Sequence, residues 1–185
     1  MPQTEFLKAF LRNPRQVGNL IQTSQFATGR MIDPIDFKQA KLIVEFGAGA
    51  GNITRRLLKR MRSDAALLCF EVDKKLSNYL EKKYPDPRIK FIADSAEDLE
   101  KYIKQYGQSR ADYIISALPL SNFSREKRRK ILKVISQSLK ADGKYIQIQY
   151  SLFNLRDLKD FFSSLTFRYE LRNIPPAFIY VCQKN

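Results

Sequence analysis

The sequence predicts one α/β domain built on an open seven-stranded sheet, mostly parallel with an antiparallel last strand. A short apolar run at 42–44 leads into the glycine-rich turn at 45–51 and then into a helical pattern, as in the first βα unit of ligand-binding sheets. The first five predicted strands are joined by helices, which parallel pairing requires. The last two strands are joined by a hairpin, so they run antiparallel to each other.

Composition indicates a folded protein with polyanionic partners. Its 185 residues are enough for one domain with a sizeable core, and 44% of them are apolar. Lys and Arg outnumber Asp and Glu by 33 to 19, which gives a formal net charge of +14. A field of this sign favours nucleic acid or an anionic membrane surface, and charge alone does not choose between them.

The residue types that the chain lacks exclude some chemistries. It has no histidine, so we expect no metal site and no Ser-His-Asp triad. Cys69 and Cys182 lie in apolar, strand-like runs without metal-ligand spacing, which is typical of reduced thiols in a cytoplasmic protein. No apolar run approaches the roughly 20 residues that span a bilayer, so any membrane association is expected to be peripheral.

Residues 1–32 are predicted to form an N-terminal helical extension ahead of the main domain at 33–185. A helix over 4–13, with Thr4 as its N-cap, places four apolar side chains on one face with a basic rim, namely Phe6, Leu7, Phe10 and Leu11. Such a helix suits a membrane interface. The alternative is a helix that packs on the core and shields the site, and one helix can do both.

The glycine turn and an acid downstream have the spacing of a nucleotide-type site. Behind Glu45, three glycines alternate with other residues, at Gly47, Gly49 and Gly51. The predicted second strand, at 65–70, ends at Glu71, where such folds bond ribose hydroxyls. The helix over 52–62 points its positive N-terminus at the turn. The pattern resembles motif I of the class I S-adenosylmethionine (SAM)-dependent methyltransferases, whose fold is Rossmann-like.

This resemblance implies SAM as the cofactor and assigns further contacts to it. Asp94 follows the third strand, at 88–93, and resembles the motif III acid that accepts the adenine amino group, with Ser95 beside the ring. Ser95 and Asp98 also fit a capping box. The segment before the first strand commonly closes over the methionine end, which makes Ser24 a candidate, with a solvated turn as the alternative. The predicted cofactor contacts are Glu45, Gly47, Ala48, Gly49, Gly51, Asn52, Glu71, Val72, Asp94, Ser95, Ser116, Ala117 and Ser24.

The loop after the fourth strand, at 111–117, corresponds to motif IV, where the transferable methyl group sits. Enzymes that methylate the exocyclic amine of adenine carry Asn or Asp, then Pro, then an aromatic residue that stacks on the flipped base. Here Ser116 stands three residues before Pro119, and Leu120 takes the place of the aromatic residue. The sequence therefore has no base-stacking side chain in the usual position.

The second half of the chain completes the predicted sheet. A helix over 124–139 begins with the densest basic cluster of the chain, at 125–130, which is either a solvated face or one that attracts phosphates. After a turn at 141–143, the fifth strand alternates cleanly over 144–150. The other predicted elements are helices over 74–84 and 155–164 and hairpin strands at 166–172 and 177–182.

Below the superfamily level, the sequence looks most like the bacterial phospholipid N-methyltransferases. The resemblance lies in the stretches 6–18, 116–123, 147–150 and 175–177 and covers almost the whole chain. It implies that the N-terminal helix docks on the anionic inner face of the membrane, and that the enzyme methylates phosphatidylethanolamine toward phosphatidylcholine. A weaker resemblance, to the rRNA adenine dimethyltransferases, keeps adenine in nucleic acid as the alternative substrate.

The expected mechanism follows from the substrate. SAM is already activated, so the protein must align the amine and present it with a free lone pair. An ammonium head group must first lose a proton, through a base or through desolvation. Because there is no histidine, Tyr150 at the end of the fifth strand is the predicted residue of the acceptor pocket, together with Ser116. A wall role for Tyr150, without proton chemistry, is the alternative.

Overall fold

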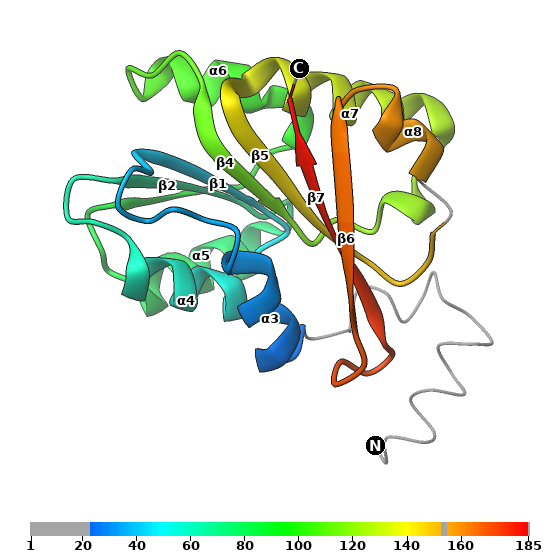
Figure 1. The fold of residues 1–185 in the computed structure, drawn as a ribbon. Coiled ribbons are helices and arrows are strands. Elements are labelled where there is room, and N and C mark those ends of the chain that lie inside the picture. The colour runs from blue at the N-terminus through cyan, green and yellow to red at the C-terminus, as the bar shows by residue number, and fades with distance from the viewer. Residues whose placement is uncertain (1–22, 153–154, 185) are drawn as a thin grey trace.

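In the computed structural model, which describes residues 23–152 and 155–184, a seven-stranded sheet lies between two layers of helices (Figure 1). The strand order is β3-β2-β1-β4-β5-β7-β6. The first five strands pair in parallel, whereas β7 runs antiparallel to both β5 and β6. The predicted α/β fold, with seven strands and an antiparallel last strand, is confirmed.

The strands are short, as is usual for an open α/β sheet. They are β1 Leu42–Phe46, β2 Ala66–Phe70, β3 Ile89–Ile92, β4 Ala111–Ser116, β5 Leu139–Gln149, β6 Ser164–Glu170 and β7 Ala177–Gln183. The α-helices are α3 Gln25–Ile32, α4 Asn52–Arg60, α5 Lys74–Lys83, α6 Leu99–Gln105, α7 Arg125–Ser138 and α8 Leu155–Lys159. Short 3₁₀ turns, η2 Ala96–Asp98 and η3 Leu120–Asn122, follow β3 and β4.

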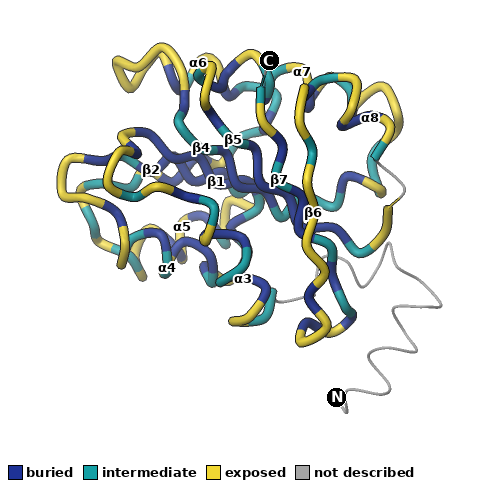
Figure 2. Tube along the Cα trace, in the orientation of Figure 1, coloured by how far each residue is buried: buried dark blue, intermediate teal, exposed yellow. Residues whose placement is uncertain are grey.

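The central strands are apolar on both faces, because helices cover both. Along β1, Val44 and Phe46 belong to the cluster formed with α6, α7 and α8, whereas Ile43 belongs to the cluster formed with α3 and α4. Figure 2 shows the resulting buried centre, with exposure rising toward β6 at the sheet edge. This two-sided burial is typical of parallel sheets.

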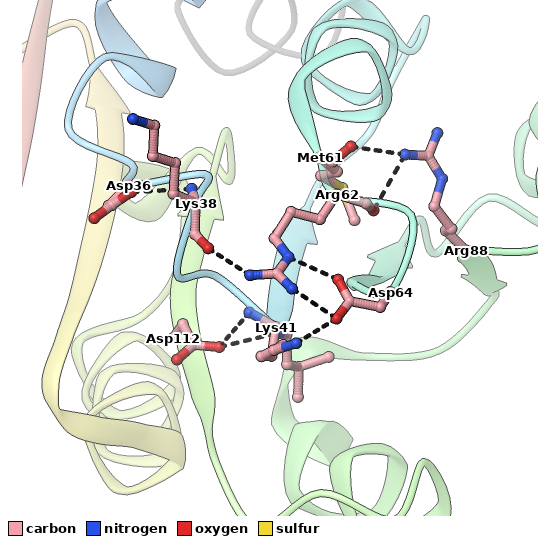
Figure 3. A network of polar contacts seen from close by, with 9 residues as sticks. Asp36, Lys38, Lys41, Met61, Arg62, Asp64, Arg88 and Asp112 are labelled. Atoms are coloured by element: carbon pink, nitrogen blue, oxygen red, sulfur yellow. Dashed lines mark hydrogen bonds and ion pairs between the residues drawn. The ribbon is translucent and has the colours of Figure 1, made fainter.

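A polar network closes the amino end of β1, away from the glycine turn (Figure 3). Asp112, next to the start of β4, accepts the backbone N–H groups of Lys41 and Leu42 at 2.9 and 2.8 Å. Arg62, just after α4, donates to both carboxylate oxygens of Asp64 and to the Lys38 carbonyl. These contacts fix β1 and β4 relative to α4, the elements that carry the site at their other ends.

Helix α3 lies within the range 1–32 predicted as a helical extension, but the sequence analysis gave no helix with these bounds. Ser24 caps it by accepting the Ala27 N–H at 3.1 Å, and Met31 and Ile32 are buried against the sheet. The Phe26 side chain, near the start of the helix, is 40% exposed. The helix has only eight residues and includes a glycine, so its helical signal was weak. The predicted helix over 4–13 lies outside the described residues.

Three boundaries in the C-terminal half also differ from expectation. The predicted turn at 141–143 is part of β5, because α7 runs directly into the strand and Leu139 already pairs with Ala111. Helix α8 ends at Lys159 rather than near 164, and the chain then enters β6 two residues earlier than expected. Pairing with β7 determines these limits, since Ser164 aligns with Gln183.

Candidate functional site

The chain turns sharply between β1 and α4, at the carboxyl edge of the sheet. Gly47, Gly49 and Gly51 have positive φ angles of 73°, 53° and 82°, a region that residues with a Cβ atom rarely adopt. Gly49 donates its N–H to Glu71 Oε2 at 3.0 Å. The glycine turn and the acid after β2 are therefore in direct contact, as their spacing predicts.

Residues at the C-terminal end of α5 contact this turn, a feature that the sequence did not reveal. The Tyr84 hydroxyl donates to the Gly51 carbonyl at 3.1 Å, and Lys83 Nζ donates to the Ala50 carbonyl at 3.2 Å. A Cβ atom on Gly51 would lie 2.8 Å from the Tyr84 ring. The last glycine is therefore needed both for its φ angle and for the close approach of Tyr84. No local pattern links residues 51 and 84, so this pairing emerges only in three dimensions.

The acids after β2 and β3 lie at adjacent strand ends. Glu71 accepts the Asp73 N–H through its other oxygen, at 3.1 Å. Asp94 accepts the Ser95 N–H at 2.8 Å and the Tyr102 hydroxyl at 3.0 Å, and these two bonds lower the pKa of Asp94. Asp94 is therefore ionised at neutral pH and can accept a donor from a ligand.

The two residues that follow these acids are placed differently. Val72 is 69% exposed beside Glu71. Ser95 accepts the Glu97 N–H at 3.2 Å through its side chain, and the Asp98 N–H bonds to its carbonyl. The Ser95 side chain thus has the predicted capping role, here at a 3₁₀ turn.

Glu45 lies behind the glycine turn rather than at its open side. Its side chain is fully buried, and its Oε2 accepts the Thr54 hydroxyl of α4 at 2.7 Å. Oε1 has no hydrogen-bond partner among the described residues, and burial raises the pKa of Glu45 to about 7. This position does not support the predicted direct contact with cofactor. Instead, Glu45 links β1 to the first turn of α4.

The motif IV loop is held by side chains of β5. Gln147 and Gln149 both donate to the Leu118 carbonyl, at 3.0 and 3.1 Å. The Ser116 hydroxyl is fully buried and accepts the Leu118 N–H at 3.2 Å. Leu120 is also fully buried. The loop backbone, rather than these side chains, therefore forms the surface at this end of β4.

Ser116 and Tyr150 are not brought together. Ser116 aligns with Phe46 and Gln147 on the face of the sheet covered by α6 and α7. Tyr150 packs against the apolar cluster on the opposite face, with α3 and α4. The predicted joint role in an acceptor pocket is therefore corrected: Ser116 orients the loop, and Tyr150 alone lies on the α3 side.

Asn173 connects Tyr150 to the segment before α3, and the sequence analysis did not identify it as a site residue. Its buried Oδ1 accepts the Ser24 N–H at 2.9 Å, and it hydrogen-bonds Tyr150. Asn52 Nδ2 donates to the Thr23 carbonyl at 3.3 Å. The segment at 23–24 therefore connects Asn52, next to the glycine turn, with Asn173 and Tyr150, and its closure over the cofactor stays a prediction.

The sequence family agrees with this geometry. A family described as "Methyltransferase domain" matches residues 43–143, more than half of the chain. The chain belongs to this methyltransferase family. The matched region begins within β1 and includes the glycine turn, Glu71, Asp94 and the motif IV loop.

Two relatives and one solved structure show how far the similarity extends along the chain. The methyltransferase is 29% identical over 181 residues to the ornithine lipid N-methyltransferase of Singulisphaera acidiphila, covering 96% of this chain and 94% of that protein. It is 28% identical over 95 residues to ribosomal RNA small subunit methyltransferase A of Thermotoga neapolitana, covering 49% of this chain and 35% of that protein. The solved 1,6-didemethyltoxoflavin-N1-methyltransferase of Burkholderia thailandensis, with S-adenosylhomocysteine bound, has a TM-score of 0.63 at 12% identity, covering 99% of this chain and 87% of that one.

The site of this SAM-dependent methyltransferase fits its cofactor chemically. The glycine turn exposes backbone at the N-terminus of α4, which suits the methionine carboxylate. Glu71 and Asp94 offer carboxylates at adjacent strand ends, which suit the ribose hydroxyls and the adenine amine. When bound, SAM supplies an electrophilic methyl group, and the residues named here bind and orient it.

Proposed function

We propose that this methyltransferase transfers methyl groups to the primary amine of a membrane-lipid head group, with phosphatidylethanolamine as substrate, at an anionic membrane surface. The observation that carries the proposal is the extent of similarity to a lipid N-methyltransferase. That alignment covers 96% of this chain, whereas the rRNA methyltransferase alignment covers 49%. The named substrate of the relative is ornithine lipid, so a lipid amine is the shared chemistry.

The acceptor side of the site supports a lipid amine over a flipped adenine. A base would need an aromatic residue to stack on at the motif IV loop, yet Leu120 is aliphatic and fully buried. The loop instead presents the Leu118 backbone, which the two β5 glutamines hold in place. The position that the stacking aromatic residue usually takes is therefore filled by a buried leucine.

Tyr150 is suited to orienting the amine rather than to deprotonating it as a phenolate. Burial raises the pKa of Tyr150 to about 12, so the phenol remains protonated at neutral pH. A phenol oxygen can still accept an N–H bond and fix the direction of the amine lone pair. Burial that disfavours a phenolate also disfavours an ammonium, so desolvation helps the substrate to lose its proton. The structure thus favours the wall interpretation of Tyr150.

Within the described residues, no helix is both long enough and apolar enough to cross a bilayer. The proposal therefore rests on peripheral contact. The predicted amphipathic helix over 4–13 is one part of that contact, and a Phe10→Glu change there is expected to weaken binding to anionic liposomes. Unchanged binding would rule out a membrane role for that helix.

Nucleic acid is the second candidate acceptor. The net charge of +14 and the partial similarity to the rRNA methyltransferase favour it. Salt-dependent RNA binding, with methyl transfer to adenine, is what this alternative predicts.

One experiment separates the two acceptors. Labelled SAM is offered with anionic liposomes that contain phosphatidylethanolamine, with liposomes that contain ornithine lipid, and with total rRNA, in parallel tubes. We expect label in the lipid fraction and none in RNA. Label in ornithine lipid alone would keep the lipid-amine class but replace the named substrate. Label in RNA alone would contradict the proposal.

A further inference from the structure

A basic pocket lies between α3 and α4, outside the site described above. It has a volume of about 310 Å³. Helix α4 contributes four cationic side chains to its lining, Arg55, Arg56, Lys59 and Arg60, and the α3 side contributes Gly29 and Asp33. The four cations follow an i, i+1, i+4, i+5 pattern, so they form one stripe along α4.

Within 23–152 and 155–184, no ion pair neutralises the cations of this pocket. Among the described residues, Arg55, Arg56 and Lys59 make no ion pair, and neither does Asp33, the pocket's single acid. Arg60 lies over the Phe37 ring, at 4.5 Å from its centroid. A concave site with four cations and one carboxylate is complementary to an anion.

The basic cluster at the start of α7 is different, although it is denser in sequence. Arg128 bonds Asp157 at 2.6 Å, and Arg129 bonds both Asp157 and Asp160. Lys130 pairs with Glu97 at 2.6 Å. These acids neutralise much of the positive charge of α7. The candidate phosphate-binding surface is therefore on α4 rather than on α7.

Gly29 keeps the pocket open. A Cβ atom at this position would lie 3.5 Å from Arg56 Nη1, which is ordinary contact. Any longer side chain would extend into the space beside the guanidinium. The α3 wall therefore leaves the Arg56 donors available to a ligand, and guanidinium groups bind phosphate oxygens in bidentate fashion.

Neighbouring surfaces indicate a lipid as the source of the phosphate. Helix α3 lies between α4 and the β6–β7 hairpin (Figure 1). On the hairpin side, Leu171 and Ile174 are 68% and 40% exposed, and Arg172 stacks 4.1 Å from the Phe26 ring centroid. Exposed aliphatic side chains beside cations suit a membrane interface, whereas aliphatic groups do not stack on bases.

We propose that the α3–α4 pocket binds the phosphate of an anionic phospholipid and so holds the enzyme on the membrane, separately from the acceptor lipid. This inference rests on the proposed lipid function. The occupant is a membrane lipid that is not itself methylated, because its phosphate is held by the stripe on α4 rather than at the Tyr150 side.

The test compares two variants that each remove three positive charges. The pocket variant is R55Q/R56Q/K59Q, and the control variant is K82Q/K104Q/K133Q, which alters exposed lysines on α5, α6 and α7. Binding to phosphatidylcholine vesicles, with and without phosphatidylglycerol, is measured by co-sedimentation without SAM. We expect the pocket variant to lose affinity for the anionic vesicles about tenfold or more, and the control variant to lose less than about threefold. Equal losses in the two variants would overturn the proposal.

A second variant fills the pocket instead of removing its positive charges. Gly29→Glu places a carboxylate beside Arg56, and we expect it to weaken anionic-vesicle binding while SAM affinity, which reports folding, stays unchanged. Normal vesicle binding by folded Gly29→Glu would count against the pocket.

Methyl transfer separates this inference from the proposed function. The wild-type protein, the pocket variant and the control variant are assayed on anionic vesicles and on a short-chain, soluble phosphatidylethanolamine. We expect the pocket variant to lose activity only on vesicles.

If wild type methylates neither lipid, the proposed function fails, whatever the binding result. If wild type is active and the pocket variant matches the control on vesicles, this inference alone fails. A loss of rRNA binding without a loss of vesicle binding would assign the pocket to RNA and overturn it too.

Discussion

At the scale of single residues, Glu45 links the site to stability. Its pKa is raised from 4.5 to about 7 by burial, so the folded state binds its proton more tightly than the unfolded chain does. Between about pH 4.5 and pH 7 the folded protein holds more protons at this site, and stability falls as pH rises. Across this pH range, the raised pKa of Glu45 lowers the free energy of unfolding by about 3 kcal/mol.

We therefore predict that Glu45→Gln flattens this decline. Chemical denaturation at a series of pH values measures the free energy of unfolding of the variant and of wild type. The gap should move in favour of the variant as pH rises from about 4.5 to 7. Parallel curves across this range would show that the Glu45 carboxyl group titrates normally.

Tyr84 is predicted to position the glycine turn. Tyr84→Phe removes the bond to the Gly51 carbonyl, so SAM should bind about two- to tenfold more weakly, which corresponds to roughly 0.5–1.5 kcal/mol for one hydrogen bond. Calorimetric titration with SAM measures the change. The control is Tyr106→Phe, because Tyr106 is partly exposed at the C-terminal end of α6. Equal SAM affinity in both variants would contradict the positioning role.

Tyr150 is predicted to orient the acceptor without acting as a base. Tyr150→Phe should lower kcat less than about tenfold and leave the pH–rate profile unchanged. A general base would be worth about 10²–10⁴-fold, and its loss would remove one limb of the profile. Rates measured from pH 6 to pH 10 distinguish the two roles, and a large loss with an altered profile would restore the base interpretation.

At the scale of elements, Gly29 costs α3 some stability. Gly29→Ala should stabilise the fold by about 0.5–1 kcal/mol, because the helical backbone suits alanine and the new Cβ makes only ordinary contact with Arg56. The matched control is Gly107→Ala, where space is open but φ is +69°. That change should destabilise by about 1–2 kcal/mol. Urea denaturation measures both, and a destabilised Gly29→Ala would mean that α3 is more tightly packed than described.

The elements also show what sequence patterns can and cannot predict. The glycine turn, Glu71 and Asp94 were found because each directly follows an apolar run at a fixed offset. The bounds of the short helix α3 were not predicted, since its burial depends on the sheet rather than on its own periodicity. Asn173 and Tyr84 were missed for a related reason: each contacts residues distant in sequence, and a single asparagine or tyrosine in a turn carries no pattern.

At the scale of the whole molecule, the sheet explains why the site was partly predictable. The carboxyl ends of β1, β2 and β3 lie side by side, so sequence offsets along each strand translate into one shared edge. Sequence could not place Ser116 and Tyr150 relative to each other, because the face that each side chain takes depends on how β4 pairs with β5. Nor could it show which basic segment is neutralised, since the partners of α7 come from α8 and η2.

The most direct test of the central claim is the identity of the methylated product. The methyltransferase is incubated with SAM, phosphatidylethanolamine vesicles and total rRNA in one mixture, and the lipid and nucleoside fractions are analysed by mass spectrometry. We predict that the lipid head group gains one or more methyl groups on nitrogen and that the adenosines remain unmodified. Methylated adenosine with unchanged lipid would contradict the assignment of a lipid amine as the acceptor.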